Sequence, residues 1–234
     1  MASKTYELEP LGNITITKRQ KNRHLRLTIG SGGQIRVSIP TWAPYQAGVD
    51  FALSKSDWIS TKLPPVSLLS EDQAIGRAHR LHFKPVAGME KTTSRIKDNQ
   101  IIISYPAHLS FNHQLVQTVA AKAATKALRS QALSLLPQRL DLLSLKHQLP
   151  YQSLQIKRLS RRWGSCDQQQ RIVLNLYLIQ MPWELIDYVI LHELTHTKHM
   201  NHGSEFWSML IRLSPEARML KRRLGQYHPG LVNV

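Results

Sequence analysis

The chain has 234 residues, 42% of them hydrophobic and 20% charged, so it is long enough to bury a core as one large domain or two small ones. Its 31 lysines and arginines against 15 acidic residues give a net charge of +16, which favours an anionic partner such as a nucleotide or nucleic acid. The single cysteine, Cys166, excludes an intrachain disulfide and a cysteine-based zinc cluster, and the apolar runs are too short to cross a membrane.

The first ten residues, MASKTYELEP, lack the apolar core of a signal peptide, so a cytoplasmic location is expected. Apolar and polar residues then alternate along 14–39, with a Gly-rich turn at 30–33, and this pattern predicts a small antiparallel sheet. The basic segment KRQKNRHLR, residues 18–26, lies on the first connection and second strand of that sheet. Residues 46–62 carry a helical apolar stripe, which the Leu-Pro-Pro segment at 63–65 ends.

A second β region follows, with strands predicted at 74–86 and 99–106 and a turn with a further strand between them. Residues 112–147 have the pattern of a long helix, in which Pro137 predicts a kink or a new start. These patterns divide the chain into a β-rich N-terminal region, residues 1–110, and a catalytic domain, residues 111–234.

Two more strands are predicted at 154–166 and 171–179, joined by the polar turn 167–170. The second of them is a candidate for the edge strand that an extended substrate would pair with. The segment WGSC, residues 163–166, is expected to be a packed turn that buries Trp163 and Cys166, with Gly164 supplying unusual backbone angles.

The next helix is expected to begin at Pro182 and to run through a group of histidines until Gly203 breaks it. Ser204 then has the position of an N-cap for the following helix. A last helix is predicted from Ser214-Pro215-Glu216 to about Gly225.

The histidine-rich helix carries the sequence HELTH, in which His192 and His196 are four residues apart and therefore share one face. Two imidazoles one turn apart can hold one zinc ion, for which histidine nitrogen is a preferred ligand. Glu193 lies between them, offset from the ion, where it can take a proton from a zinc-bound water. Two histidines on a buried helix face can also be ordinary core residues, but the further histidines downstream favour a metal site.

The third ligand has three candidates. His202 follows the helix and would arrive from a turn, in a direction from which it can close a tetrahedron with the first two rings. His199 would be displaced about 4.5 Å along the axis if the helix continued, and is then a supporting or surface histidine. Glu205 is a further alternative, because a carboxylate can be a zinc ligand.

The segments RRWGSC, RIVLNLYLI and PWELIDYVILHELTHTKHMNHGSEFW together resemble the YgjP-like family of zinc metallopeptidases, which is related to the SprT and WLM proteins among the zincins. The resemblance extends to GQIRVSIP and SKSDWISTKL nearer the N-terminus and so covers most of the chain. It implies one zinc ion held by His192, His196 and His202, with Glu193 as the base. Some members of the family are described as nucleotide pyrophosphatases, and an activated water serves either reaction.

Residues around the motif have structural as well as functional interpretations. Phe206 and Trp207 are expected to anchor the His202 turn against the metal helix. Other candidates for a direct role are Arg161 and Arg162 as partners of an oxyanion or phosphate, Asn175 and Tyr177 as substrate contacts, and Asp187 as a partner that orients a ligand histidine.

The sequence therefore predicts an α+β protein in which an HExxH helix packs on a small sheet, in the manner of a zincin. The expected function is that of a zinc-dependent hydrolase, with a peptide or protein substrate ranked first and a nucleoside triphosphate second. A basic nucleic-acid-binding protein with a structural metal is the alternative from another class. Aromatic residues are 7% of the chain, which gives little support to a base-stacking surface, and no membrane partner is expected.

Overall fold

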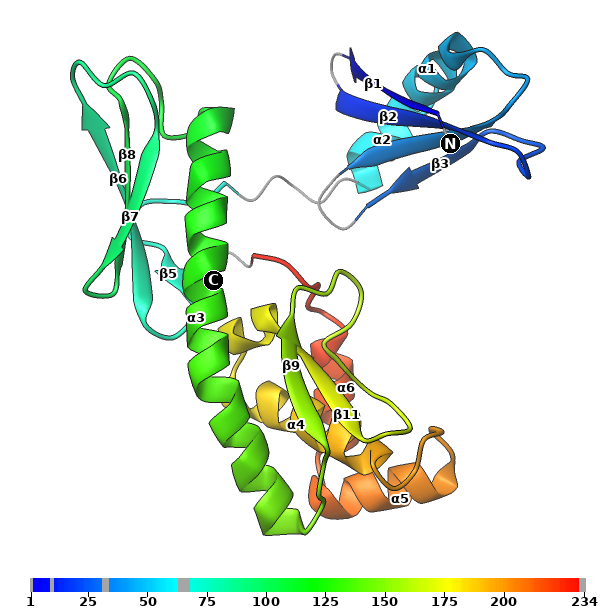
Figure 1. Ribbon diagram of the computed structural model, residues 1–234, viewed down its shortest axis with the longest axis vertical. Helices are drawn as coiled ribbons and strands as arrows, with labels where there is room; N and C mark the ends of the chain where they lie inside the picture. The colour runs from blue at the N-terminus through cyan, green and yellow to red at the C-terminus, as the bar shows by residue number, and fades with distance from the viewer. Residues whose placement is uncertain (1, 9–10, 31–33, 63–67, 232–234) are drawn as a thin grey trace. The chain divides into compact units, whose positions relative to one another are not determined.

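The computed structural model describes residues 2–8, 11–30, 34–62 and 68–231, with the backbone alone for residues 60–62 (Figure 1). The chain divides into two compact units, Met1–Ser67 and Leu68–Val234. The division predicted after residue 110 falls inside the second unit, because the strands that precede it pack against the long helix that follows it.

The first unit contains a four-stranded sheet. Its strands are β1 (Ser3–Leu8), β2 (Gly12–Arg19), β3 (Arg26–Ile29) and β4 (Ile35–Pro40), in the spatial order β1-β2-β4-β3. The prediction of an antiparallel sheet is wrong for one pair, since β2 and β4 are parallel. The alternation of apolar and polar residues along a strand predicts which face of the strand is buried, but it does not predict the order of the strands. Here β4 lies between β2 and β3, so that β2 and β3, although consecutive in the chain, do not pair with each other.

Two helices complete the first unit, α1 (Tyr45–Leu53) and α2 (Ser56–Lys62), where one helix was predicted. The break lies at Ser54, whose backbone caps α1. Helix α1 packs against β2 and β4 so closely that a Cβ on Gly48 would lie 2.9 Å from Ile16. The core between the helices and the sheet contains Ile14, Ile16 and Ile59 with no exposed surface. The Leu-Pro-Pro segment and most of the predicted turn at 30–33 lie outside the described residues.

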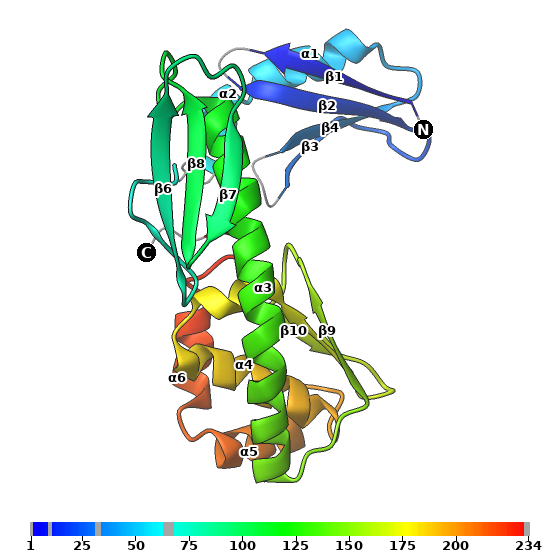
Figure 2. The same ribbon diagram turned by 60° about the vertical axis from the view of Figure 1, so that its left-hand side comes forward.

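The second unit begins with another four-stranded sheet, with β5 (Ala74–Ile75), β6 (His79–Val86), β7 (Thr93–Lys97) and β8 (Gln100–Pro106) in the order β5-β6-β8-β7. These strands agree with the prediction, apart from a break after Ile75. Helix α3 (Gln114–His147) covers one face of the sheet (Figure 2). The alanine-rich part of α3 is buried there, and its small side chains let the helix approach the strands closely.

Helix α3 joins the two halves of the second unit. Its 34 residues span about 50 Å. The helix continues through Pro137, so the predicted alternative of a new helix starting at this proline is wrong. The N-terminal half packs on the β5–β8 sheet, while Leu136, Leu140 and Leu143 in the C-terminal half are buried against the elements that follow. Gln148 ends the helix in the left-handed conformation, with a φ of 54°.

A small three-stranded sheet lies beside the C-terminal half of α3. Its strands are β9 (Ser153–Lys157), β10 (Gly164–Cys166) and β11 (Arg171–Asn175), in the order β10-β11-β9. The strand predicted at 154–166 is thus two strands, on opposite sides of β11. The strand predicted at 171–179 stops at Asn175, whose side chain caps the short 3-10 helix η1 (Leu176–Gln180). Because β11 is central, the predicted edge strand is wrong, and β10 is an edge instead.

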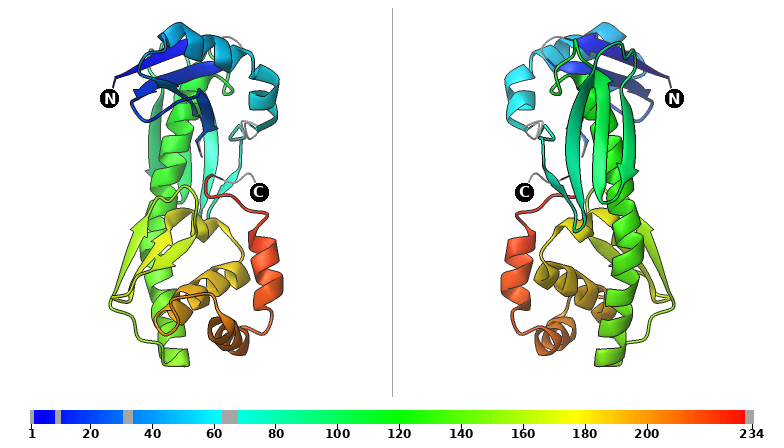
Figure 3. Two further views of the ribbon diagram at one scale, coloured as in Figure 1. Left: turned by 90° about the vertical axis from the view of Figure 1, so that its right-hand side faces the viewer. Right: turned by 90° about the vertical axis from the view of Figure 1, so that its left-hand side faces the viewer.

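Three helices gather at this end of the unit, beside the small sheet (Figure 3). They are α4 (Trp183–His196), α5 (Ser204–Leu213) and α6 (Ala217–Leu224). Helix α4 packs against β10, β11 and α3, so the predicted α+β class with the HExxH helix on a small sheet is confirmed. The N-cap of α5 is Gly203 rather than the predicted Ser204. Among the described residues, no helix combines the length and apolarity that a membrane span requires.

Candidate metal centre

Helix α4 places the first three residues of the site. Pro182 precedes its first residue with an extended backbone, and Glu184 lies in its first turn, where an acidic side chain is favourable. The apolar residues of the helix are almost fully buried, among them Leu185, Ile186, Ile190 and Leu194. This burial fixes the rotation of the helix and turns His192, Glu193 and His196 toward β10 and α5, against which α4 packs.

Three histidines converge at the C-terminal end of α4. One ring nitrogen each from His192, His196 and His202 lies within 4.8 Å of the other two. The Nε2 atoms of His192 and His202 are 3.0 Å apart. The ring centroids are separated by 4.9 Å between His192 and His196, and by 4.7 Å between His196 and His202. In the described part of the chain, this is the one group of three or more side chains with the geometry of a metal site.

The end of helix α4 decides which later histidine joins the group. The prediction that this helix continues to Gly203 is wrong: it stops at His196, with Thr197 as its C-cap, and residues 198–203 form a turn. This turn brings the His202 ring back over the helix, as the sequence argument for a ligand from a turn required. The backbone carbonyl of His199 accepts a hydrogen bond from Nδ1 of His196 at 3.0 Å. That bond holds the His196 ring so that Nε2 is left without a proton.

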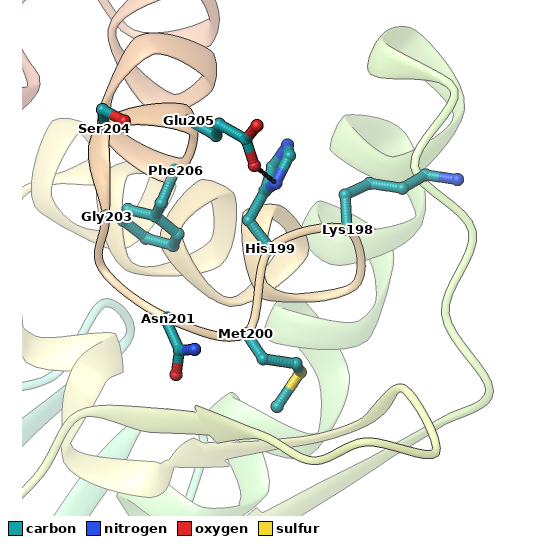
Figure 4. A pocket seen from close by; sticks show the side chains of 8 residues that line it. All are labelled: Lys198, His199, Met200, Asn201, Gly203, Ser204, Glu205 and Phe206. Carbon is teal, nitrogen blue, oxygen red and sulfur yellow. Dashed lines mark ion pairs between the residues drawn. The ribbon is translucent and has the colours of Figure 1, made fainter.

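The His199 ring takes a different direction. Its Nδ1 lies 3.5 Å from Oε2 of Glu205, and the two side chains face each other across the surface of the turn (Figure 4). They line a pocket of about 370 Å³ together with Lys198, Met200 and Asn201. Neither alternative third ligand, His199 or Glu205, belongs to the converging group.

Phe206 forms the floor of the histidine group. Its side chain is fully buried, and its ring centroid lies 4.9 Å from that of His192, 4.6 Å from His196 and 4.7 Å from His202. Helix α5 therefore supports all three rings through one residue, as predicted for an anchor of the turn. Trp207 is half-buried, and Nζ of Lys221 lies over its ring, 4.7 Å from the ring centroid.

Burial favours the neutral form of the His192 and His196 rings. Burial lowers the pKa of His192 to about 3, with smaller contributions from His196, His202 and the charge of Lys221. Burial also lowers the pKa of His196. Neutral imidazoles keep a free lone pair at physiological pH, which is the form that binds a metal ion. Nδ1 of His192 is buried and has no hydrogen-bond partner within the described residues.

Glu193 lies beside the histidines in a tightly enclosed position. It is 5% exposed, and burial raises the pKa of its carboxyl group to about 8, an effect that the positive charge of Arg162 opposes. A Cβ atom on Gly164 would lie 2.6 Å from Oε1 of Glu193 and 2.9 Å from its carboxyl carbon. The backbone of the edge strand β10 therefore lies directly against the carboxyl group.

The same contact explains the glycine of the WGSC turn. Sequence analysis attributed Gly164 to unusual backbone angles, but its φ lies outside the left-handed region and the close approach of Glu193 is the reason. A glycine in a strand is a signal for such an approach, although the pattern does not identify the partner.

The model of the family described as YgjP-like, metallopeptidase domain, matches residues 23–227. The chain belongs to the YgjP-like family. The resemblance found in the sequence motifs is thereby confirmed, and it covers most of both units.

Among solved structures, this YgjP-like protein is similar to abylysin of Pyrococcus abyssi, described as a metallopeptidase zymogen, at 20% identity and a TM-score of 0.37. The similarity covers 42% of this chain and all of the abylysin chain. Comparison with curated proteins finds no match.

The turn before β10 is organised by Asn175. This side chain is fully buried, and its Nδ2 donates hydrogen bonds to the carbonyl oxygens of Leu159 and Arg162 at 2.8 and 2.9 Å. Asn175 thus holds the segment that leads to Gly164. It is a structural residue instead of the substrate contact that was considered, and Tyr177 is likewise buried.

The structure also places the other residues for which the sequence suggested a role. Trp163 is buried in the core as expected, while Cys166 is half-buried, and burial with the charges of Glu193 and Asp167 raises its pKa to about 11. Asp187 does not orient a histidine, since it accepts hydrogen bonds from the guanidinium group of Arg139, one of them at 2.6 Å. Arg161 and Arg162 are exposed.

Proposed function

We propose that this YgjP-like protein is a zinc-dependent peptidase whose ion is held by His192, His196 and His202 and whose base is Glu193. The observation that supports the proposal most directly is the convergence of three imidazoles beside one buried carboxyl group. All four residues belong to the predicted catalytic region, residues 111–234, to which we assign the chemistry.

The donor set fits a zinc ion. Two nitrogens bound at about 2.0–2.1 Å to a tetrahedral ion lie about 3.3 Å apart, and the Nε2 atoms of His192 and His202 are 3.0 Å apart. Three ligands leave a fourth position for a water molecule or the substrate, as in catalytic zinc sites. The hydrogen bond from His196 to the His199 carbonyl supplies the outer support that such ligands usually have.

A zinc ion bound there would lower the pKa of a water molecule to about 7 and polarise the carbonyl group of a substrate. Glu193 then accepts a proton from the attacking water and delivers it to the leaving amide nitrogen. With a divalent cation beside it, Glu193 would ionise at a lower pH than its buried position otherwise allows, and the charge of Arg162 acts in the same direction.

Strand β10 offers a place for an extended peptide. In the sheet, its one partner is β11, and its other edge has no strand partner among the described residues. The backbone of Gly164 lies against Glu193, so a peptide paired along β10 would run beside the proposed base. Main-chain hydrogen bonds of this kind hold a substrate without requiring a particular sequence.

Metal analysis and paired hydrolysis assays test the proposal. Purified protein is expected to contain about one zinc ion per chain and to hydrolyse members of a peptide library, and Glu193→Gln is expected to retain the ion while it loses the activity. Hydrolysis of nucleoside triphosphates alone, lost in the same variant, would reject the peptidase assignment. A protein that takes up no metal would reject the whole proposal.

A further inference from the structure

The sheet of the first unit has one face that its helices leave open. On β2, Ile14 and Ile16 are fully buried, whereas Thr15 and Thr17 between and beyond them are partly exposed. Adjacent strands repeat this alternation, and their registers bring the outward residues into rows. We call this set the open face; it consists of Ser3, Thr5, Glu7, Asn13, Thr15, Thr17, Arg19, Arg26, Thr28, Arg36 and Ser38, so that three arginines stand against one glutamate.

The rows combine hydroxyl groups with guanidinium groups. Thr5, Thr15, Arg36 and Thr28 are successive partners across the four strands, and Ser3, Thr17, Ser38 and Arg26 form the next row. Arg26 and Arg36 are therefore diagonal neighbours on an antiparallel pair, about 7–8 Å apart. Arginine, serine and threonine are side chains that donate hydrogen bonds to phosphate oxygens.

The cations of this face have no carboxylate partner among the described residues. Arg36 donates to the neutral side chain of Gln34 at 2.9 Å, and the backbone carbonyls of Arg36 and Arg26 accept from Thr28 and Ser38. Arg19 and Arg26 are exposed, and no ion pair involves a described residue of the first unit. The uncompensated charge is thus available to an anion from outside.

The open face of the β5–β8 sheet provides a contrast within the same chain. There, Arg80 pairs with Asp72 at 3.0 Å, His82 lies 2.9 Å from Glu71, and Lys97 lies 3.6 Å from Asp98. Two of the four lysines and arginines of that face, Arg80 and Lys97, are therefore paired with carboxylates, whereas Lys84 and Arg95 are in no ion pair among the described residues. A general excess of lysine and arginine does not by itself account for the difference between the two sheets.

Basic residues continue beyond the sheet. The connection from β2 to β3 adds Lys21, Arg23 and His24, all of them exposed. A partner that follows the open face would meet the charges of Lys21 and Arg23 as well, because the connection runs from Arg19 to Arg26. The positive surface is therefore extended, as a long polyanion requires and a single small anion does not.

The side chains of the open face indicate which kind of polyanion it can bind. It has no aromatic side chain, so it lacks the stacking platforms with which proteins hold unpaired bases. A duplex presents its phosphates on the outside, at about one charge per 1.7 Å of axis, and several cations and hydroxyls on a sheet can contact it at once. We propose that the open face binds the phosphate backbone of duplex nucleic acid, independently of base sequence and of the proposed hydrolytic activity.

Binding of the full chain to a DNA duplex of about 20 base pairs, measured by fluorescence anisotropy over a salt series, tests the proposal. The double variant Arg26→Ser/Arg36→Ser is expected to bind about tenfold or more weakly, with a salt slope smaller by about 2. A second double variant, Arg19→Ser/Arg26→Ser, is expected to behave alike. All of the replaced positions are exposed, and thermal unfolding of each variant checks that the unit is folded.

The matched control is Lys84→Ser/Arg95→Ser, which removes the same charge from exposed positions on the other sheet and is expected to bind as the wild type does. Equal weakening by the control would overturn the proposal in favour of unspecific charge attraction. Absence of duplex binding at low salt would also overturn it, as would binding only to vesicles that contain anionic lipid.

Discussion

The contact between Gly164 and Glu193 makes a sharp prediction for Gly164→Ala. The added Cβ would lie 2.6 Å from Oε1, 2.8 Å from Cγ and 2.9 Å from the carboxyl carbon of Glu193, where ordinary contacts begin at 3.4 Å. The strand or the carboxyl group must therefore move by about 0.8 Å. Overpacking of this kind typically destabilises a protein by about 1–3 kcal/mol.

The effect on catalysis is expected to exceed the effect on folding. A general base acts over hydrogen-bond distances, and a displacement of about 1 Å can lower a rate by about 100-fold. The nearest neighbours of the added Cβ all belong to Glu193 and none to the histidines, so the zinc content is expected to stay at the wild-type value. Peptide hydrolysis and metal content, measured on the same preparation, distinguish displacement of the base from loss of the ion.

Gly203→Ala is the matched control for this experiment. Gly203 lies in the turn that carries His202, a Cβ added there would meet nothing within 4 Å, and its φ is −75°. This variant is expected to keep both zinc and activity. Full activity in Gly164→Ala would refute the argument that the β10 backbone positions Glu193, whereas equal losses in both variants would show that the region tolerates no added methyl group.

Three further predictions concern single residues. His202→Ala is expected to lower zinc affinity by at least about 100-fold. His199→Ala is expected to keep the wild-type affinity, because only the backbone carbonyl of His199 supports the site. Isothermal titration compares the two variants, and equal losses of affinity would contradict the ligand assignment. In metal-free protein, the raised pKa of Glu193, about 8, means that the folded state holds a proton that the unfolded state releases near pH 4.5. The free energy of unfolding of the wild type, relative to Glu193→Gln, should therefore fall by about 2 kcal/mol between pH 6 and pH 8, and parallel denaturation curves would exclude this coupling. Asn175→Ala removes two hydrogen bonds that a fully buried side chain donates, and should destabilise the protein by about 1–3 kcal/mol in urea unfolding. A change below about 0.5 kcal/mol, the scatter for surface substitutions, would argue against its structural role.

Helix α4 shows how much of the structure local sequence patterns can predict. The apolar stripe on both sides of His192 predicts a buried helix, and Pro182 predicts its start to within one residue, since Pro182 is the N-cap and Trp183 the first helical residue. The spacing of four residues then requires His192 and His196 to share a face. Each of these conclusions depends on neighbours within about two helical turns, and the structure agrees with each of them because the periodicity of a helix is a property of the backbone.

Other features depend on partners that are distant in the chain. Gly164 contacts Glu193 across 29 positions, and Asn175 bonds to Leu159 and Arg162. Patterns in the sequence indicated that these residues were special, but they suggested unusual backbone angles for the glycine and a substrate contact for the asparagine. The actual reasons lie in which backbone segment packs against each side chain.

The sequence by itself determined the residue types of the site, the helix that carries two of its histidines, and the family to which the chain belongs. Tertiary structure decided that helix α4 ends at His196, that the His202 ring and not the His199 ring closes the group, and that β10 and not β11 is the edge strand beside Glu193. The physical reason is that periodicity and spacing record the geometry of one element. The packing of elements, which sets where chains end, cross and pair, sums many small contacts between residues far apart in the sequence.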